Sequence, residues 1–362
     1  MKILYVSGAG EHPYCSGPGL IRAFRKLGHE VWAVGMSYGR FGLDFNHEIP
    51  NRSHIEWVPY SEVLKDCPWE SDVVLYVEPH AYAQGPKPTG LISATYQTDP
   101  HRSGILLRDT LKEGIYNILF LGQPHYFPLF ERAAEQVKIV LPGFDTGRIQ
   151  KSLEIPPQCD ISFVGFTGIA NMEYPDKDQW GNYAIHPPKC VYDGRPEERY
   201  AIDHIGYDYA ERAEYLIRLC SDFSVRMYEN VWEPPAFQGA LQVGKIGFHR
   251  SLLNDIAIRC FEVMAAKRLL VADEAVLSKH VDPWGLFVPY RSFYRPFFSN
   301  FDVEYSHTRD LIAHYLETVD TRQRIVANAQ TYAFNNCTWE KRAESMAIAI
   351  NRYRASKGLK HE

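Results

Sequence analysis

The sequence predicts an α/β protein made of two Rossmann-like, doubly wound units. Short apolar runs alternate with segments of helical periodicity in both halves of the chain, as in parallel sheets that helices cover on both faces. The 362 residues correspond to roughly two domains of about 150 residues. A proline-containing segment, Lys151 to Gln158, separates the two series of elements. We therefore expect two units facing each other across a cleft, with ligands at the carboxyl ends of their strands.

The first series of elements starts at the beginning of the chain. Apolar runs predict strands at Lys2 to Ser7, Glu30 to Gly35, Asp72 to Val77, Leu91 to Tyr96, Asn117 to Leu121 and Val137 to Leu141. Helical patterns predict helices at Gly17 to Leu27, closed by Gly28, and around Ile105–Glu113 and Pro124–Glu135. These elements define an N-terminal unit of residues 1–155.

The second series starts with Cys159 to Gly165, a strand that runs into a glycine. Further strands are expected at Phe223 to Tyr228, Lys245 to His249, Arg268 to Ala272 and Leu286 to Pro289, after a helix that begins near Asp208. Residues 167–207 have no clear period and form an insertion in a C-terminal unit of residues 156–340. The amphipathic helix 341–356 can pack back on the first unit.

Composition excludes several classes of protein. There are 39 Lys and Arg against 44 Asp and Glu, so a net charge of -5 gives no general reason to expect nucleic-acid binding. No apolar run reaches the ~18 residues of a membrane-spanning helix, and the first residues do not form a signal peptide. The seven cysteines contain no Cys-x-x-Cys pair, and His-Glu-x-x-His is absent. We expect a cytoplasmic protein with reduced thiols.

The run from Arg259 to Asp273 carries the most chemical information. On a helix, its apolar residues would lie on one side, and Arg259 and Glu262 would project together from the other. The carboxylate of Glu262 can accept both hydroxyls of a ribose, while Arg259 can bind a diphosphate. The alternative is a surface ion pair, which is common at this spacing.

Several runs, taken together and in order, resemble those of GT-B glycosyltransferases. They are Thr95 to His101, Leu141 to Asp145, Asp160 to Gly165, Lys245 to Ser251, Arg259 to Asp273, Leu311 to Leu316, Arg324 to Ala327 and Cys337 to Arg342. The greatest similarity is to the CgeB-like (spore maturation protein type) group, relatives of the group 1 glycosyltransferases. The resemblance covers most of the chain except residues 167–207. It implies a GT-B fold and transfer of a hexose or pentose from a nucleotide-sugar, expected to be UDP-linked, to an acceptor hydroxyl.

The same resemblance implies roles for the two units and for individual residues. The C-terminal unit would bind the donor, with Glu262 on the ribose, and the N-terminal unit the acceptor. The other implied donor ligands are Arg259 on a phosphate and Lys245, His249, Arg250 and Ser251 near the diphosphate and the transferred sugar. Asn254, also an implied donor ligand, replaces a glutamate that group 1 enzymes often have and can still hydrogen-bond a sugar hydroxyl, and Lys267 replaces a usual glycine. GT-B enzymes commonly need no metal, and no convincing Asp-x-Asp pair occurs, so we expect neither metal nor cofactor.

The loop that follows the first strand is a candidate for binding a phosphate or the acceptor. It lacks the Gly-x-Gly-x-x-Gly and Gly-Lys-Ser/Thr patterns, which excludes a dinucleotide fingerprint and a P-loop. Gly8, Gly10 and Gly17 near a helix N-terminus nevertheless suit a close approach of substrate to backbone. In GT-B enzymes this loop borders the acceptor, so His12 is a candidate general base. A solvated loop histidine is the alternative.

Asp99 and His101 follow the strand that ends at Tyr96. A carboxylate beside an imidazole can activate an acceptor hydroxyl, so both are candidate catalytic residues. The alternative is that Asp99 caps a turn, since Asp-Pro favours turn initiation. A working base at His12 or Asp99 would mean inversion at the anomeric carbon, whereas the likeness to group 1 enzymes leans towards retention.

The sequence leaves the acceptor open among a glycan, a metabolite, a protein and a modified nucleic-acid base. The insertion interleaves aromatic and basic residues, which can stack on bases or sugars or can hold a long loop in place. A phage-type glycosyltransferase acting on modified DNA bases is therefore one alternative function. A sugar-nucleotide epimerase and a catalytically inactive structural member of the family are two others.

Overall fold

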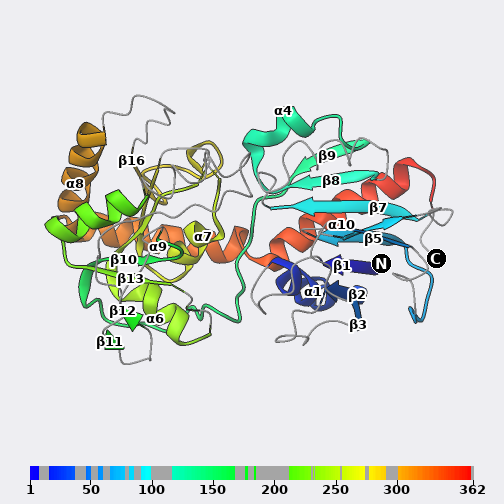
Figure 1. Ribbon diagram of the computed structural model, residues 1–362, viewed down its shortest axis with the longest axis horizontal. Helices are drawn as coiled ribbons and strands as arrows, with labels where there is room; N and C mark the ends of the chain where they lie inside the picture. Colours follow the sequence, from blue (N-terminus) through cyan, green and yellow to red (C-terminus); the bar gives the residue numbers. More distant parts are fainter. Residues whose placement is uncertain are drawn as a thin grey trace. The chain divides into compact units, whose positions relative to one another are not determined.

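The computed structural model of the protein divides into two compact units (Figure 1). The N-terminal unit joins Met1–Asp145 to Cys337–Glu362, and the C-terminal unit is Thr146–Asn336. The structure describes residues 1–7, 16–36, 46–49, 56–59, 66–77, 81–84, 91–98, 116–167, 176–177, 183–184, 212–229, 231, 233–252, 255–273, 277–290 and 301–359. No helix within these residues is long and apolar enough to span a membrane.

The N-terminal unit contains a seven-stranded parallel sheet. The strand order is β3-β2-β1-β5-β7-β8-β9. The strands are β1 (Lys2–Ser7), β2 (Glu30–Met36), β3 (His47–Ile49), β5 (Val73–Val77), β7 (Ile92–Gln97), β8 (Ile118–Leu121) and β9 (Gln136–Ile139). All residues of β5, β7 and β8 are buried, as expected for a parallel sheet covered on both faces. This confirms the predicted strands. A separate parallel pair joins β4 (Glu56–Pro59) to β6 (Ala81–Gln84).

Helices α1 (Ser16–Lys26) and α10 (Trp339–Ser356) pack against each other in this unit. The first helix ends where Gly28 takes a φ of 82°, the left-handed conformation that glycine adopts at helix ends. A Cβ atom on Gly19 would lie 2.4 Å from a ring carbon of Trp339, so only glycine permits this approach. The predicted apolar stripe of α10, which includes Met346 and Ile350, is buried.

The run Leu141 to Asp145 anchors the chain where it returns to this unit. The amide of Phe144 donates to the carbonyl of Cys337, and the amide of Trp339 donates to the carbonyl of Phe144. Asp145 forms an ion pair with Arg22 of α1. In the described structure, this run therefore holds α10 in place.

The C-terminal unit contains a five-stranded parallel sheet in the order β13-β10-β14-β15-β16. The strands are β10 (Cys159–Val164), β13 (Val225–Tyr228), β14 (Gly244–His249), β15 (Leu269–Asp273) and β16 (Val288–Tyr290). Helices α6 (Ala236–Gln242) and α7 (Ile258–Ala265) touch one face at Ser162 and Gly247. The helix of residues 212–222 and α8 (Phe301–Glu317) bury Tyr215 and Ile312 in a core on the sheet. The remaining elements of this unit are α9 (Val319–Asn336) and the short helix η4 (Leu277–Lys279).

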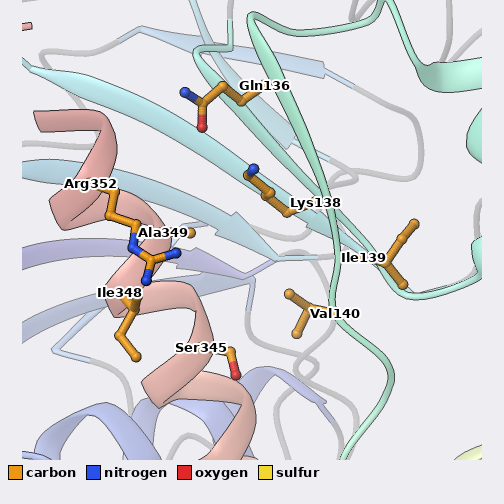
Figure 2. Close-up of a pocket in the computed structure, with 8 residues that line it drawn as sticks. All are labelled: Gln136, Lys138, Ile139, Val140, Ser345, Ile348, Ala349 and Arg352. Atoms are coloured by element: carbon orange, nitrogen blue, oxygen red, sulfur yellow. The ribbon is translucent and has the colours of Figure 1, made fainter. Parts of the chain in front are cut away.

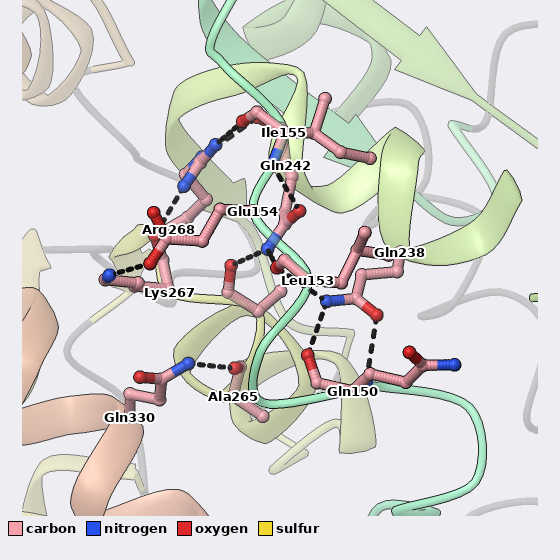
Figure 3. A network of polar contacts seen from close by, with 11 residues as sticks. Gln150, Leu153, Glu154, Ile155, Gln238, Gln242, Ala265, Lys267, Arg268 and Gln330 are labelled. Atoms are coloured by element: carbon pink, nitrogen blue, oxygen red, sulfur yellow. Dashed lines mark hydrogen bonds and ion pairs between the residues drawn. The ribbon is translucent and has the colours of Figure 1, made fainter. Parts of the chain in front are cut away.

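The proline-containing segment belongs to the C-terminal unit, so the boundary lies after residue 145 instead of residue 155. Two buried glutamines of α6, Gln238 and Gln242, hold this segment (Figure 3). Their side-chain amides form hydrogen bonds of 2.8–3.2 Å with backbone groups of Gln150, Leu153 and Ile155. The segment is thus fixed to α6 and is no free linker.

Two predicted segments differ from the structure or lie outside it. The predicted helix 124–135 is short: η2 (Pro124–Tyr126) and α4 (Phe127–Phe130) give way to turns, because the chain must extend to enter β9. In these turns Glu135 accepts from Asn117 and pairs with Lys357, each over 2.7 Å. The helix predicted at 105–113 lies outside the described residues. Residues 168–211 also lie outside the described part of the chain, except for the antiparallel strands β11 (Asp176–Lys177) and β12 (Tyr183–Ala184).

Candidate functional site

The strand order of the C-terminal sheet reverses between β10 and β14. In open α/β sheets, ligands bind at the carboxyl ends of the strands at such a reversal. Here β14 ends at His249 and β10 ends at Val164. Arg212, at the start of the helix of residues 212–222, connects the two ends: its guanidinium donates to the carbonyl of Phe166, over 2.9 Å, and to the carbonyl of Arg250. The predicted donor residues from His249 onward therefore follow the strand that borders the reversal.

His249 is a buried, neutral histidine at this position. Its side chain is almost fully enclosed, and its Nε2 has no hydrogen-bond partner among the described residues. Burial, together with the nearby charges of Arg212 and Arg259, lowers the pKa of His249 to about 3. A neutral imidazole has one N–H donor and one acceptor, so His249 can offer Nε2 to a ligand.

Glu262 of α7 is a buried carboxylate held by two arginines. Nη1 of Arg148 donates to Oε1 over 3.2 Å, and Nη1 of Arg259 lies 2.8 Å from Oε2. The side chains of Arg148 and Glu262 are each 4% exposed, and that of Arg259 is 16% exposed. The surface ion pair considered from the spacing is therefore wrong, because Glu262 is enclosed and a second arginine reaches it from a distant part of the chain.

These groups give the site an excess of positive charge. Arg148 and Arg259 share a single carboxylate, and Arg212 lies close enough to His249 to affect its pKa. The guanidinium carbons of Arg148 and Arg259 lie 3.1 and 4.7 Å from the centre of the Phe237 ring, which shields one side of the cluster. A site of this kind suits an anionic ligand that also presents hydroxyl groups to a carboxylate.

Two predicted donor residues, Arg250 and Ser251, are engaged in buried contacts. Nη1 of Arg250 lies 2.7 Å from Oε1 of Glu304, in a pair that is 7% and 1% exposed. Ser251 donates from its amide to Asp273 over 3.1 Å and from its hydroxyl to the other carboxylate oxygen. Burial raises the pKa of Asp273, and these hydrogen bonds oppose the rise. Both side chains thus brace the strand ends that surround His249.

The structure does not place Lys245 beside the other predicted donor residues. Lys245 lies at the amino-terminal end of β14, opposite His249, and pairs with Asp160 over 2.9 Å. In the N-terminal unit, Gly17 lies in the first turn of α1, close to the predicted start of this helix, and its carbonyl accepts from the hydroxyl of Tyr5 over 2.9 Å. The other predicted residues lie outside the described part of the chain: Gly8, Gly10, His12, Asp99, His101 and Asn254.

The structure explains one departure from the family pattern. Lys267, where relatives usually have glycine, takes a φ of 60° directly after α7, and L-residues other than glycine rarely adopt this conformation. The backbone therefore keeps the shape that glycine would favour. The helix starts at Ile258, directly after the extended N-cap residue Ala257, so Arg259 and Glu262 both lie in α7 as predicted.

A hollow of about 410 Å³ lies in the N-terminal unit between β9 and α10 (Figure 2). It is lined by Gln136, Lys138, Ile139, Val140, Ser345, Ile348, Ala349 and Arg352, none of which the sequence predicts as a site residue. In the part of the chain that the structure describes, no group of three or more His, Cys, Asp or Glu side chains could hold a metal ion. Metal independence stays a prediction.

Comparisons with known proteins identify the fold. No protein-family profile matches the chain, and no curated protein matches its sequence. Several solved structures do match it over nearly its full length. HepE from Anabaena, in complex with UDP and glucose, has a TM-score of 0.60 and 14% identity, over 97% of this chain and all of the other. A glycosyltransferase from Rickettsia africae ESF-5 has a TM-score of 0.58 and 12% identity, over 97% and 98%.

A third similar structure is an α-glucosyltransferase in complex with UDP and a 13-mer DNA containing an HMU base. Its TM-score is 0.55 and its identity 11%, over 97% of this chain and 99% of the other. The chain has the GT-B fold. This confirms the fold class predicted from the sequence, whereas membership of the CgeB-like group stays a prediction.

Proposed function

We propose that the chain is a glycosyltransferase that moves a sugar from a UDP-linked donor to an acceptor hydroxyl, with its C-terminal unit binding the donor. The observation that carries this proposal is the cationic cluster beside the buried Glu262 and the neutral His249. It lies where ligands bind in open α/β sheets. Its charge fits a diphosphate and its carboxylate fits a ribose. HepE, which has the same fold, has been solved with UDP-glucose.

The reaction forms a bond from the acceptor oxygen to the anomeric carbon and breaks the bond from that carbon to the diphosphate oxygen. The diphosphate leaves with the bonding electrons, and the acceptor proton passes to a base. Arg259 and Arg212 would stabilise the negative charge that develops on the diphosphate, which is the main electrostatic demand of the step. His249 would donate from Nε2 to a phosphate oxygen. His12, Asp99 and His101 are the predicted candidates for the base.

A panel of nucleoside diphosphates tests the donor half of this proposal. A ligand at about 100 times its dissociation constant should stabilise the protein by roughly 2.7 kcal/mol, which is visible as a higher melting temperature. We expect UDP and a UDP-sugar to raise the melting temperature and ADP to have little effect. A folded sample that responds to none of the nucleotides would contradict the proposal.

A screen of acceptors distinguishes sugar transfer from the two alternative functions, epimerisation of the donor and an inactive family member. A glycosyltransferase releases UDP in step with glycosylated acceptor, whereas an epimerase converts the donor sugar without an acceptor. An inactive family member would do neither. Release of UDP should be unaffected by EDTA, because we propose that the reaction needs no metal.

Modified DNA is a second candidate acceptor, since one structure with the same fold was solved with DNA that contains an HMU base. DNA carrying hydroxymethylated bases therefore belongs in the screen beside glycans, small metabolites and proteins. A DNA substrate should bind with a steep dependence on salt, because binding releases counterions from the phosphates. Salt-independent binding would speak against it.

A further inference from the structure

Arg148 is a buried arginine that the sequence motifs do not include. It lies just after the start of the C-terminal unit and reaches Glu262, 114 residues further along the chain. Its Nη1 donates to Glu262 over 3.2 Å, and its Nη2 donates to the carbonyl of Val231 over 3.1 Å. Its guanidinium carbon lies 3.1 Å from the centre of the Phe237 ring. Three contacts in different directions fix the plane of this guanidinium.

The two arginines of the cluster have different access to a ligand. Arg148 is 4% exposed and holds Oε1 of Glu262 from the inside, while Arg259 is 16% exposed and approaches Oε2. A carboxylate oxygen has more than one acceptor site, so both oxygens can still accept hydroxyl groups. A ligand therefore meets Glu262 on the side of Arg259, and Arg148 acts from behind.

Helix α6 contributes several of the contacts that hold Arg148 and the segment that follows it. Phe237, Gln238 and Gln242 all belong to α6. The two glutamines bind the backbone of residues 150–155 immediately after Arg148 (Figure 3), and Phe237 packs on its guanidinium. Helix α6 thus holds both the side chain of Arg148 and the backbone that follows it. Such support gives a binding carboxylate a fixed orientation before the ligand arrives, which lowers the entropic cost of binding.

We propose that Arg148 is a positioning residue that orients the carboxylate of Glu262 towards the ribose hydroxyls of the donor, a proposal that rests on the proposed function. Arg148 does not touch the donor. Its effect is confined to the interaction of Glu262 with the ribose, and so it should favour ribonucleotides over deoxyribonucleotides.

Calorimetric titration with UDP and with 2′-deoxy-UDP tests this assignment. The wild type should prefer UDP by about 10- to 100-fold, the range for a hydrogen bond to a charged group. In Arg148→Met, the affinity for UDP should fall towards the affinity for 2′-deoxy-UDP. The affinity for 2′-deoxy-UDP should be close to that of the wild type. Arg148→Lys keeps the positive charge but loses the planar guanidinium with its several N–H donors. It should show the same selective loss of affinity for UDP. Arg218→Met is the matched control, because the ion pairs of Arg218 with Glu214 and Asp302 lie on the surface, and it should keep the full preference.

A second variant guards against loss of folding. Phe237→Leu keeps all charges and loosens the guanidinium of Arg148, so it should lower the preference for UDP over 2′-deoxy-UDP; its contact with Arg259 adds a weakening that is common to both nucleotides. Equal weakening of both nucleotides in folded Arg148→Met, or an unchanged preference in the folded Arg148 and Phe237 variants, would overturn the proposal by showing a merely structural role. A wild type that binds both nucleotides equally would also overturn it. A wild type that binds neither would instead refute the proposed function itself.

Discussion

Replacing Glu262 by alanine in the ligand-free protein should strongly destabilise the C-terminal unit. Both carboxylate oxygens are paired, at 3.2 Å to Arg148 and 2.8 Å to Arg259. Arg259 is partly exposed and can turn to water, whereas Arg148 is enclosed and loses the carboxylate that it binds. Removing one partner of a buried ion pair costs about 3–5 kcal/mol, so we expect a loss of this size in the free energy of unfolding.

Urea unfolding followed by circular dichroism measures this loss. Glu214→Ala is the matched control: Glu214 is 49% exposed and its pair with Arg218 is a surface i,i+4 contact, so its loss should be within about 0.5 kcal/mol. A cost below about 1 kcal/mol for Glu262→Ala would refute the reasoning, because it would mean that Arg148 finds water or another partner without Glu262.

Two further predictions concern packing and pH. Gly19→Ala should lower stability by about 1–2 kcal/mol in thermal or urea unfolding, since overpacking against the buried Trp339 outweighs the better helix propensity of alanine; an equal loss in a Trp339→Ala background would contradict the contact. The pKa of His249 is lowered to about 3, so its contribution to stability is fully present above about pH 6.5 and is lost as the pH falls from there towards 3. Between pH 7.5 and 5 the wild type should therefore lose about 2 kcal/mol more than His249→Gln, and identical pH profiles would show that the ring is accessible to protons.

The regular elements could be predicted from the sequence because their signals are local. The strands of both sheets are short apolar runs, and Gly28 closes α1 through a backbone conformation that favours glycine. Features that depend on contacts between distant parts of the chain are harder to predict from the sequence. The unit boundary was set too late, because the contacts of Gln238 and Gln242 with the preceding segment cannot be read from either stretch alone.

The candidate site was predictable only in part for the same reason. The pairing of Arg259 with Glu262 follows from their spacing in a helix, but the contact of Glu262 with Arg148, a single arginine in an irregular segment, does not. Arg212 was missed as well, since nothing in its helix marks a residue that joins two strand ends. The resemblance implies that Lys245 lies near the diphosphate with His249, although a strand places its two ends at opposite edges of a sheet.

Titration of UDP into the wild type, Glu262→Gln and Glu214→Gln tests most directly whether the C-terminal unit binds the donor through Glu262. Glutamine keeps the shape of the side chain and an oxygen that can accept from Arg148 while it removes the charge, so the titration is made on variants that circular dichroism shows to be folded. We predict that UDP binds the wild type and Glu214→Gln equally and binds Glu262→Gln about 10- to 100-fold more weakly. Equal affinity for UDP in Glu262→Gln and in the wild type would contradict the account.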